Sequence, residues 1–346
     1  MPEMFLRVNI AAAGTLKNCF LPILNTRDSS LHTTPGLKIQ PAAVLRPDMP
    51  DAPAPGAAAE SIENYVAGMN GNQVKITILV DNKAASGLMA EHGLSFWIET
   101  EGVCILFDTG QGGALPLNAR ALGINLNQAD MLVLSHGHFD HTGGIPSVMQ
   151  QNSKTGVYAH PGIMHPRYSI RDGLPRPIQM PEKSMTILDR LPAQRIHWIT
   201  QPLSLSENIG ITGPIPRDAS FEDTGGPFYL DPEGKSADPI EDDLALWIRT
   251  RSGLVVCAGC CHAGLVNTLN HVRRLTGEKS IRAVIGGFHL LNATGKRIEL
   301  TVNALHALSP RMMVPCHCTG DTATRILQDA LGERVVPGYA GAIYHL

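Results

Sequence analysis

The first sustained pattern of hydrophobic positions begins at residue 75, where polar and apolar side chains alternate as in a half-buried β-strand. Residues 75–81 read Lys-Ile-Thr-Ile-Leu-Val-Asp, and the apolar runs 94–99 and 103–107 flank a Thr-Glu-Gly turn. Two such runs joined by a short turn with glycine predict a β-hairpin. The chain from residue 75 onward is therefore expected to open with antiparallel strands.

Further along the chain, helical spacing alternates with short apolar runs. Helices are expected at 113–123, 265–275, 297–308 and 322–331, and strands at 131–134, 244–250, 254–258, 283–285 and 312–314. Strands that come first in a meander and then alternate with helices suit two packed sheets with helices outside. The pattern predicts one α/β domain over residues 71–346.

Residues 1–70 show neither period. They contain eight prolines and an Ala/Pro run at 51–59, so they bury too little apolar surface to offset the entropy of ordering. We expect a poorly ordered Pro/Ala-rich extension. Its start lacks the basic n-region of a signal peptide, which disfavours export and favours a cytoplasmic location.

Composition and charge exclude several classes of function. The chain of 346 residues has 43% hydrophobic and 17% charged residues and a net charge of -3. No apolar run is long enough to span a membrane, and no basic block marks a nucleic-acid surface. Seven cysteines, several of them crowded between residues 257 and 261, suggest reduced thiols rather than a disulfide framework. We expect no membrane and no nucleic-acid partner, and the sequence leaves the oligomeric state open.

The densest chemical signal is His136-Gly-His-Phe-Asp-His141, directly after the strand expected at 131–134. Residues two apart in an extended segment point the same way, so His136 and His138 can bind one cation. The following turn directs Asp140 and His141 toward a second cation. Imidazole and carboxylate ligands suit Zn²⁺ best, with iron, manganese or nickel as alternatives. The motif predicts a centre of two divalent metal ions.

This motif, preceded by Phe107-Asp-Thr-Gly110, resembles the metallo-β-lactamase superfamily. The resemblance implies a four-layered αββα sandwich with a dinuclear site at one sheet edge. Other motifs are similar to the branch that contains 7,8-dihydropterin-6-methyl-4-(β-D-ribofuranosyl)aminobenzene-5′-phosphate synthase: Glu91-His-Gly-Leu-Ser95, Ile215-Pro-Arg217, Gly259-Cys-Cys-His-Ala-Gly264, Gly286-Gly-Phe-His-Leu290 and His317-Cys-Thr-Gly320.

Two metals need further ligands from later strand ends. His317 matches the last metal-binding histidine of the superfamily and would complete the Asp140/His141 site. His262, after the strand at 254–258, is expected to complete the first site. Where the superfamily has a bridging aspartate, this sequence has Cys260, so either Cys260 or Asp243 is a candidate bridging ligand, and a packing role for the thiol stays open.

Other residues are candidates for supporting or substrate-binding roles. Asp108 matches the Asp-Thr-Gly motif of the superfamily, which suggests a hydrogen bond to a metal-binding histidine rather than metal ligation. His289 follows a strand at the same edge and is a candidate for contact with substrate and for general acid catalysis, and His160 is a weaker candidate for substrate contact.

The Pro/Gly-rich stretch 168–243 is expected to form a lid-like insertion over the site. Within it, Arg217 is a candidate clamp for an anionic substrate group, because a guanidinium offers paired donors to phosphate oxygens. A solvated arginine in a loop is the competing interpretation.

The metals suggest the chemistry. The sequence favours a metal-dependent hydrolase in which a metal-bound hydroxide, oriented by Asp140, attacks a phosphorylated or ester-type small molecule that is anionic. The resemblance leaves two alternatives: a group transferase that joins a pterin to a phosphorylated partner, and a non-catalytic module that binds small molecules on the same fold.

Overall fold

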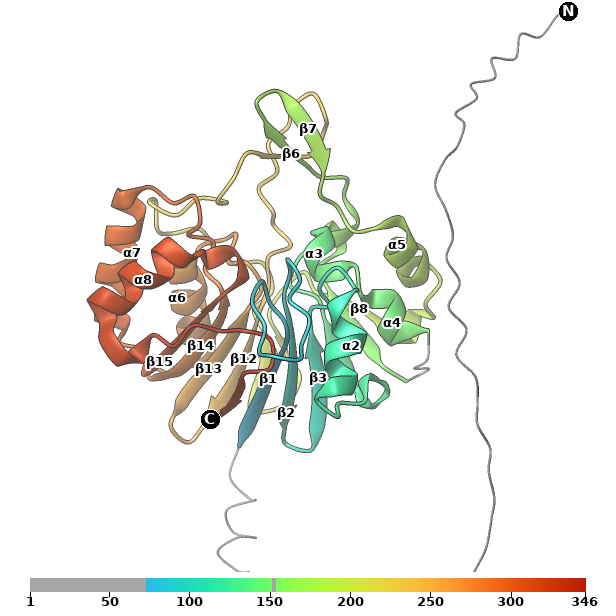
Figure 1. Cartoon of the computed structure of the whole chain (residues 1–346), viewed down its shortest axis with the longest axis horizontal. Coiled ribbons are helices and arrows are strands. Elements are labelled where there is room, and N and C mark those ends of the chain that lie inside the picture. The colour runs from blue at the N-terminus through green and yellow to red at the C-terminus, as the bar shows by residue number, and fades with distance from the viewer. Residues whose placement is uncertain (1–72, 151–153) are drawn as a thin grey trace, which may run out of the picture. The chain divides into compact units, whose positions relative to one another are not determined.

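The computed structural model describes residues 73–150 and 154–346. The extension expected over residues 1–70 lies outside the described residues. The domain expected from residue 71 onward contains two large β-sheets, which lie face to face with helices on their outer sides (Figure 1).

The first sheet contains seven strands, and its edges come from distant parts of the chain. Their spatial order is β16 (Ile343–His345), β1 (Val74–Val80), β2 (Ser95–Thr100), β3 (Val103–Phe107), β4 (Met131–Val133), β5 (Gly156–Ala159) and β8 (Ile196–Trp198). The strands β1, β2 and β3 form the expected antiparallel meander, whereas β3, β4, β5 and β8 are parallel.

The second sheet contains six strands. Their order is β15 (Met312–Cys316), β14 (Ile281–Gly287), β13 (Gly253–Ala258), β12 (Ala245–Thr250), β10 (Ile209–Ile211) and β9 (Leu203–Ser204). The strands β13, β14 and β15 run parallel to one another. Their carboxyl ends therefore meet at one edge of this sheet.

Both sheets bury both of their faces, which explains their nearly continuous apolar strands. On β3, Ile105 and Phe107 face the core between the sheets, while Leu106 between them faces the outer helices. On β13, Val255 and Cys257 likewise face the central core. The result is the αββα sandwich that the sequence predicts.

Helices cover the two outer faces (Figure 1). Over the first sheet lie α2 (Ala114–Ala121), α4 (Ile145–Met149) and α5 (Glu182–Asp189), and over the second lie α6 (Leu265–Thr276), α7 (Gly295–Leu308) and α8 (Asp321–Leu331). Short 3₁₀ helices connect the elements: Leu126–Gln128, Pro161–Met164, Ala193–Arg195, His317–Thr319 and Gly332–Arg334. Within the described ranges, no helix combines the length and apolar character needed to cross a bilayer.

The segment 168–243 is divided by the structure rather than forming a single lid. Its α5, β8, β9 and β10 belong to the sandwich. A separate three-stranded sheet forms from β11 (Phe228–Tyr229), β6 (Tyr168–Arg171) and β7 (Leu174–Pro177). We call it the cap sheet, and Figure 1 shows its β6–β7 hairpin projecting beyond the carboxyl ends of the parallel strands.

Candidate metal centre

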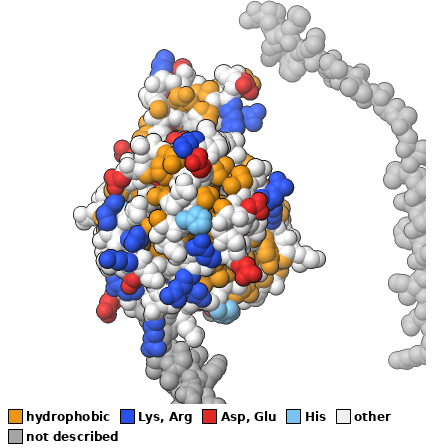
Figure 2. Space-filling view, turned by 90° about the vertical axis from the view of Figure 1, so that its left-hand side faces the viewer, with side chains coloured by type: hydrophobic (Ala, Val, Ile, Leu, Met, Phe, Trp, Pro, Cys, Tyr) orange, Lys and Arg blue, Asp and Glu red, His pale blue; other side chains and the backbone are white. Residues whose placement is uncertain are grey.

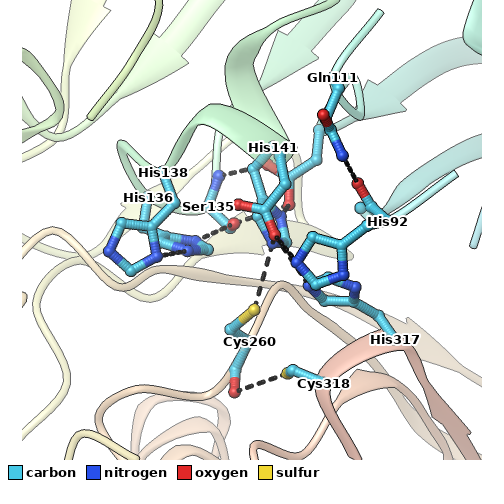
Figure 3. A network of polar contacts seen from close by, with 12 residues as sticks. His92, Gln111, Ser135, His136, His138, His141, Cys260, His317 and Cys318 are labelled. Carbon is cyan, nitrogen blue, oxygen red and sulfur yellow. Dashed lines mark hydrogen bonds and ion pairs between the residues drawn. The ribbon is translucent and has the colours of Figure 1, made fainter. Parts of the chain in front are cut away.

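The metal-competent side chains come from loops that follow three strands, β4, β13 and β15. His136 and His138 follow β4, and Asp140 and His141 lie in α3 (Phe139–Thr142) immediately afterwards. Further ligands, Cys260, His262 and His317, follow β13 and β15. The first of these strands belongs to one sheet and the other two to the second sheet, and residues up to 181 positions apart in the chain (317 minus 136) meet in one cluster where the loops of the two sheets come together (Figure 3).

Three groups of potential ligand atoms each lie within 4.8 Å of one another. They are His136 with Cys260 and His262, His141 with Cys260 and His317, and His92 with Asp140 and His317. Cys260 is common to the first two groups. The arrangement offers two neighbouring cation sites with a shared thiol between them.

The first site is built around His136. Its Nε2 lies 3.0 Å from His138 Nδ1, and its ring centroid lies 4.7 Å from that of His262. The Nε2 atoms of His138 and His262 are buried without a hydrogen-bond partner among the described residues. Buried polar atoms that lack a partner are costly, so this convergence fits a cation that these nitrogens would ligate.

The second site is built around Asp140. Its Oδ2 lies 3.2 Å from His317 Nε2 and 4.0 Å from His141 Nε2. His141 Nε2 also lies 3.2 Å from Cys260 Sγ (Figure 3). Imidazole, thiol and carboxylate ligands together are typical of Zn²⁺ or Fe²⁺ sites.

The outward-facing nitrogens of these histidines are engaged by the protein. His141 Nδ1 lies 2.7 Å from Asp108 Oδ2, and His262 Nδ1 lies 2.7 Å from the Thr224 carbonyl oxygen. His317 Nδ1 similarly lies 2.8 Å from Asn82 Oδ1. Such contacts place the ring proton on Nδ1 and leave the Nε2 lone pair for a metal.

Burial also prepares the imidazoles for metal binding. It lowers the pKa of His136, His138 and His262 well below the usual value, and neighbouring positive charges add to the effect. For His317, burial likewise outweighs the opposing effect of Asp140, and the pKa is lowered. These rings are therefore neutral near neutral pH, which is the form that ligates cations.

Asp140 and His141 behave differently. Burial opposes ionisation of Asp140, but His141 and the hydrogen bonds of His317 and His92 hold the pKa of this carboxyl well below its usual range. Burial opposes protonation of His141, yet Asp108 and Asp140 raise its pKa to about 9. The pocket thus concentrates negative charge around His141, and a cation placed there would be stabilised.

Several residues of the centre adopt backbone conformations that are unusual without glycine. Asp108, Cys261, His289 and His317 have φ values of 57°, 54°, 44° and 47°. Such residues store strain that the surrounding structure must offset, and they cluster at functional sites. The strand ends turn sharply here, which directs the side chains into the pocket.

His92 is a member of the centre to which the sequence patterns assign no role, although it lies in the motif Glu91-His-Gly-Leu-Ser95. Its Nε2 lies 3.1 Å from Asp140 Oδ2, and its ring centroid lies 4.7 Å from that of His317. The preceding Glu91 accepts hydrogen bonds from four backbone N–H groups around the start of α2, including Gly113 and Ala114. The motif Glu91-His-Gly-Leu-Ser95 therefore joins a helix N-terminus to the metal centre.

The structure places the candidate substrate residues unequally. His289 is buried in the pocket, with its ring centroid 4.4 Å from that of His262, and its Nδ1 has no hydrogen-bond partner among the described residues. His160 does not line this pocket. Its Nδ1 accepts a hydrogen bond from the Gly162 N–H at the start of a 3₁₀ helix.

Two further candidates are engaged elsewhere. Asp243 accepts a hydrogen bond of 2.7 Å from the Ala263 N–H, and it belongs to none of the three groups of ligand atoms. Arg217 donates to the carbonyl oxygens of His262, Pro239 and Ile240. Its guanidinium therefore holds loops behind the centre, and the structure does not bring it to the pocket as an anion clamp.

The comparisons with known proteins agree with this geometry. Residues 89–273 match the family model for the metallo-beta-lactamase superfamily. The chain belongs to the metallo-β-lactamase superfamily. A solved structure described as a metal-dependent hydrolase of the beta-lactamase superfamily shares 30% sequence identity with it, with a TM-score of 0.67. The match covers 79% of this chain and 99% of the other.

Two curated proteins from Methanocaldococcus jannaschii are similar to this chain. The 7,8-dihydropterin-6-methyl-4-(beta-D-ribofuranosyl)-aminobenzene-5′-phosphate synthase is 32% identical over 286 residues, which is 79% of this chain and 96% of the relative. A protein described as uncharacterized is 30% identical over 270 residues, covering 78% of this chain and 98% of the relative.

Proposed function

We propose that this metallo-β-lactamase-fold protein is a metal-dependent hydrolase that acts on a phosphorylated or ester-type small molecule. The observation that carries the proposal is the convergence of imidazole, carboxylate and thiol ligand atoms in groups within 4.8 Å, two of which share Cys260. The similarity to a metal-dependent hydrolase over 79% of the chain supports it.

The residues fit two divalent cations, with Zn²⁺ the best match to the mixed nitrogen, sulfur and oxygen donors. His136, His138 and His262 would hold one cation, and Asp140, His141 and His317 the other, with Cys260 between them. When bound, such cations supply Lewis acidity, which activates water as a nucleophile and neutralises negative charge that develops on substrate oxygens.

Two side chains, Asp140 and His289, would act on the water and the substrate. Asp140, ionised and buried, accepts hydrogen bonds and orients the attacking water. His289 has a pKa lowered to about 4 by burial and by His317, so its ring is neutral near pH 7. A neutral imidazole donates a hydrogen bond through its N–H group to a substrate oxygen, which stabilises the leaving group.

Metal analysis and a substrate panel test this proposal. Purified protein loaded with Zn²⁺, Fe²⁺ or Mn²⁺ would be assayed on phosphomonoesters, phosphodiesters, lactones and β-lactams, with ¹⁸O-water to follow hydrolysis. We expect about two metals per chain and ¹⁸O in the product. Metal binding without turnover of any of these would instead support a small-molecule-binding module.

A second function is supported by the 32% identity to the dihydropterin-linked synthase. In that case the centre would promote transfer of a pterinylmethyl group from a diphosphate to an aromatic acceptor rather than to water. Incubation of the metal-loaded protein with both reactants distinguishes the two functions, because transfer yields a joined product that carries no ¹⁸O from solvent.

The cysteines support a cytoplasmic location, which we also propose. The six cysteines of the described residues are all free, and five of them are buried. Reduced thiols of this kind are typical of proteins in reducing compartments.

A further inference from the structure

One basic side chain faces the metal centre from the cap sheet. A cavity of about 190 Å³ opens beside the centre, and among the described residues that line it Arg171 is the only lysine or arginine. We propose that Arg171 binds a phosphate group of the substrate and so makes the enzyme selective for phosphorylated small molecules. This inference rests on the proposed function and names the substrate class of the same site.

The guanidinium of Arg171 has its charge available for a ligand. Arg171 is exposed, and no carboxylate lies within 4.0 Å of it in the part of the chain that the structure describes. Two other arginines that the sequence places in or next to the segment 168–243 are engaged: Arg167 forms buried ion pairs, and Arg217 donates to backbone carbonyl oxygens. Of these three, Arg171 alone combines a free charge with a position at the cavity.

The cap sheet holds Arg171 in a defined position relative to the metal ligands. Arg167, four residues earlier and 1% exposed, pairs with Asp238 at 2.9 Å and with Asp242. Asp242 Oδ2 in turn accepts a hydrogen bond of 2.8 Å from the Gly137 N–H, between the metal-binding His136 and His138. A buried carboxylate thus connects the base of the cap sheet to the metal-binding loop.

Backbone pairing adds to this connection. The Phe139 N–H donates to the Ile178 carbonyl oxygen at 3.0 Å, and the Ile170 N–H donates to the Pro227 carbonyl oxygen at 3.0 Å. The first bond joins the residue after β7 to α3, and the second joins β6 to the residue before β11. Lys and Arg side chains lie at this projecting end of the molecule (Figure 2).

The lining of the cavity matches a phosphorylated organic molecule. Ser169 lies on the same face of β6 as Arg171, because residues two apart in a strand point the same way. Its hydroxyl and the Asn292 amide supply neutral donors, while Phe228 and Leu291 supply apolar walls. The Arg171 guanidinium can form paired hydrogen bonds with phosphate oxygens. It would then hold the anionic end of the substrate while the metal centre contacts the reacting bond.

Steady-state kinetics test the proposal on the metal-loaded enzyme. For Arg171→Ala we expect KM for phenyl phosphate to rise about 10- to 100-fold, from the loss of hydrogen bonds to a charged group. The effect on phenyl acetate should be much smaller, and Arg171→Lys should restore part of the loss. Arg176→Ala is the matched control, since Arg176 is exposed on β7 of the same hairpin and does not line the cavity.

Anion binding provides a readout that does not depend on turnover. Calorimetric titration of zinc-loaded protein with inorganic phosphate and pyrophosphate should show weaker binding in Arg171→Ala than in the parent or Arg176→Ala, at equal zinc content. Equal affinity in all three proteins, an equal loss in both variants, or no anion binding by the parent would overturn the inference. Arg171-dependent anion binding without hydrolysis would contradict the hydrolase function alone.

Discussion

Cys260 Sγ lies 3.2 Å from His141 Nε2 and belongs to two of the three groups of possible ligand atoms. Burial and the neighbouring Cys318 raise the pKa of the Cys260 thiol well above its usual value. A cation is therefore needed to stabilise the thiolate. This position makes Cys260 the candidate bridging ligand, in place of the aspartate of the wider superfamily. Asp243, the other candidate, accepts a hydrogen bond from the Ala263 N–H instead.

Replacing the Cys260 thiol should change the metal centre without unfolding the domain. For Cys260→Ser we expect a lower metal content and loss of the near-ultraviolet thiolate-to-cobalt absorption in Co²⁺-substituted protein. Cys257→Ser provides the comparison, because Cys257 is buried in the core between the sheets and belongs to none of the ligand groups. An unchanged cobalt spectrum in Cys260→Ser would contradict thiolate ligation.

Removal of a motif histidine should empty one cation site. We expect His138→Ala to lose at least one metal per chain and nearly all turnover. The Nδ1 atom of His138 lies 3.0 Å from His136 Nε2, and its buried Nε2 has no hydrogen-bond partner among the described residues. The control is His306→Ala. His306 lies in the last turn of α7, outside the centre, so this variant should bind as much metal per chain as the parent protein. Elemental analysis by plasma mass spectrometry measures both, and full metal content in His138→Ala would refute the assignment.

The carboxylate behind His141 should matter through orientation. Asp108 Oδ2 lies 2.7 Å from His141 Nδ1, while its Oδ1 accepts a hydrogen bond of 2.7 Å from the Ser135 N–H. For Asp108→Asn we expect metal affinity to fall about 10- to 100-fold. Competition with a chromophoric chelator measures it. An affinity within error of the parent would show that His141 needs no such support.

A glycine packed against His289 offers a test of that ring's position. Gly225 has φ +86°, and a Cβ atom added there would overlap the His289 ring. We expect Gly225→Ala to displace His289 and lower kcat about 100-fold, in line with the loss of proton transfer or hydrogen bonding to the substrate.

The matched control for this substitution is Gly173→Ala. Gly173 has φ +72°, but among the described residues no heavy atom lies within 4 Å of a Cβ atom added there. It should therefore show only the backbone strain of about 1–2 kcal/mol, seen as a shift in denaturant midpoint, with kcat close to that of the parent. An equal loss of kcat in both variants would assign the effect to strain rather than to His289.

The anchor of the cap sheet should contribute strongly to stability. Arg167 is buried and pairs with Asp238 and Asp242. For Arg167→Ala we expect a loss of about 3–5 kcal/mol in the free energy of unfolding, since two buried carboxylates would lose their partner. Arg274→Ala breaks an exposed ion pair with Asp218 and should lower the free energy of unfolding by about 1 kcal/mol or less. Urea titrations compare the two.

The sequence by itself predicted the central motif and many of the strands and helices outside the segment 168–243, within which it named none. Strands such as β3 and β13 and helices such as α6 and α8 lie within a few residues of their expected bounds, because local periodicity reports which side chains are buried. The motif from His136 to His141 was recognisable for a different local reason, because four possible ligands are crowded within six consecutive residues.

The sequence also named Cys260, His262 and His317, which the structure brings to the motif, but only the tertiary structure added His92 and Arg171. His92 reaches Asp140 through the path of the β1–β2 loop, and Arg171 reaches the cavity because the β6–β7 hairpin folds over it. Arg217, by contrast, donates hydrogen bonds to backbone carbonyl oxygens and does not line the cavity. Single arginines and histidines carry no local signal of their partners, since those contacts depend on chain segments brought together by the packing of two sheets.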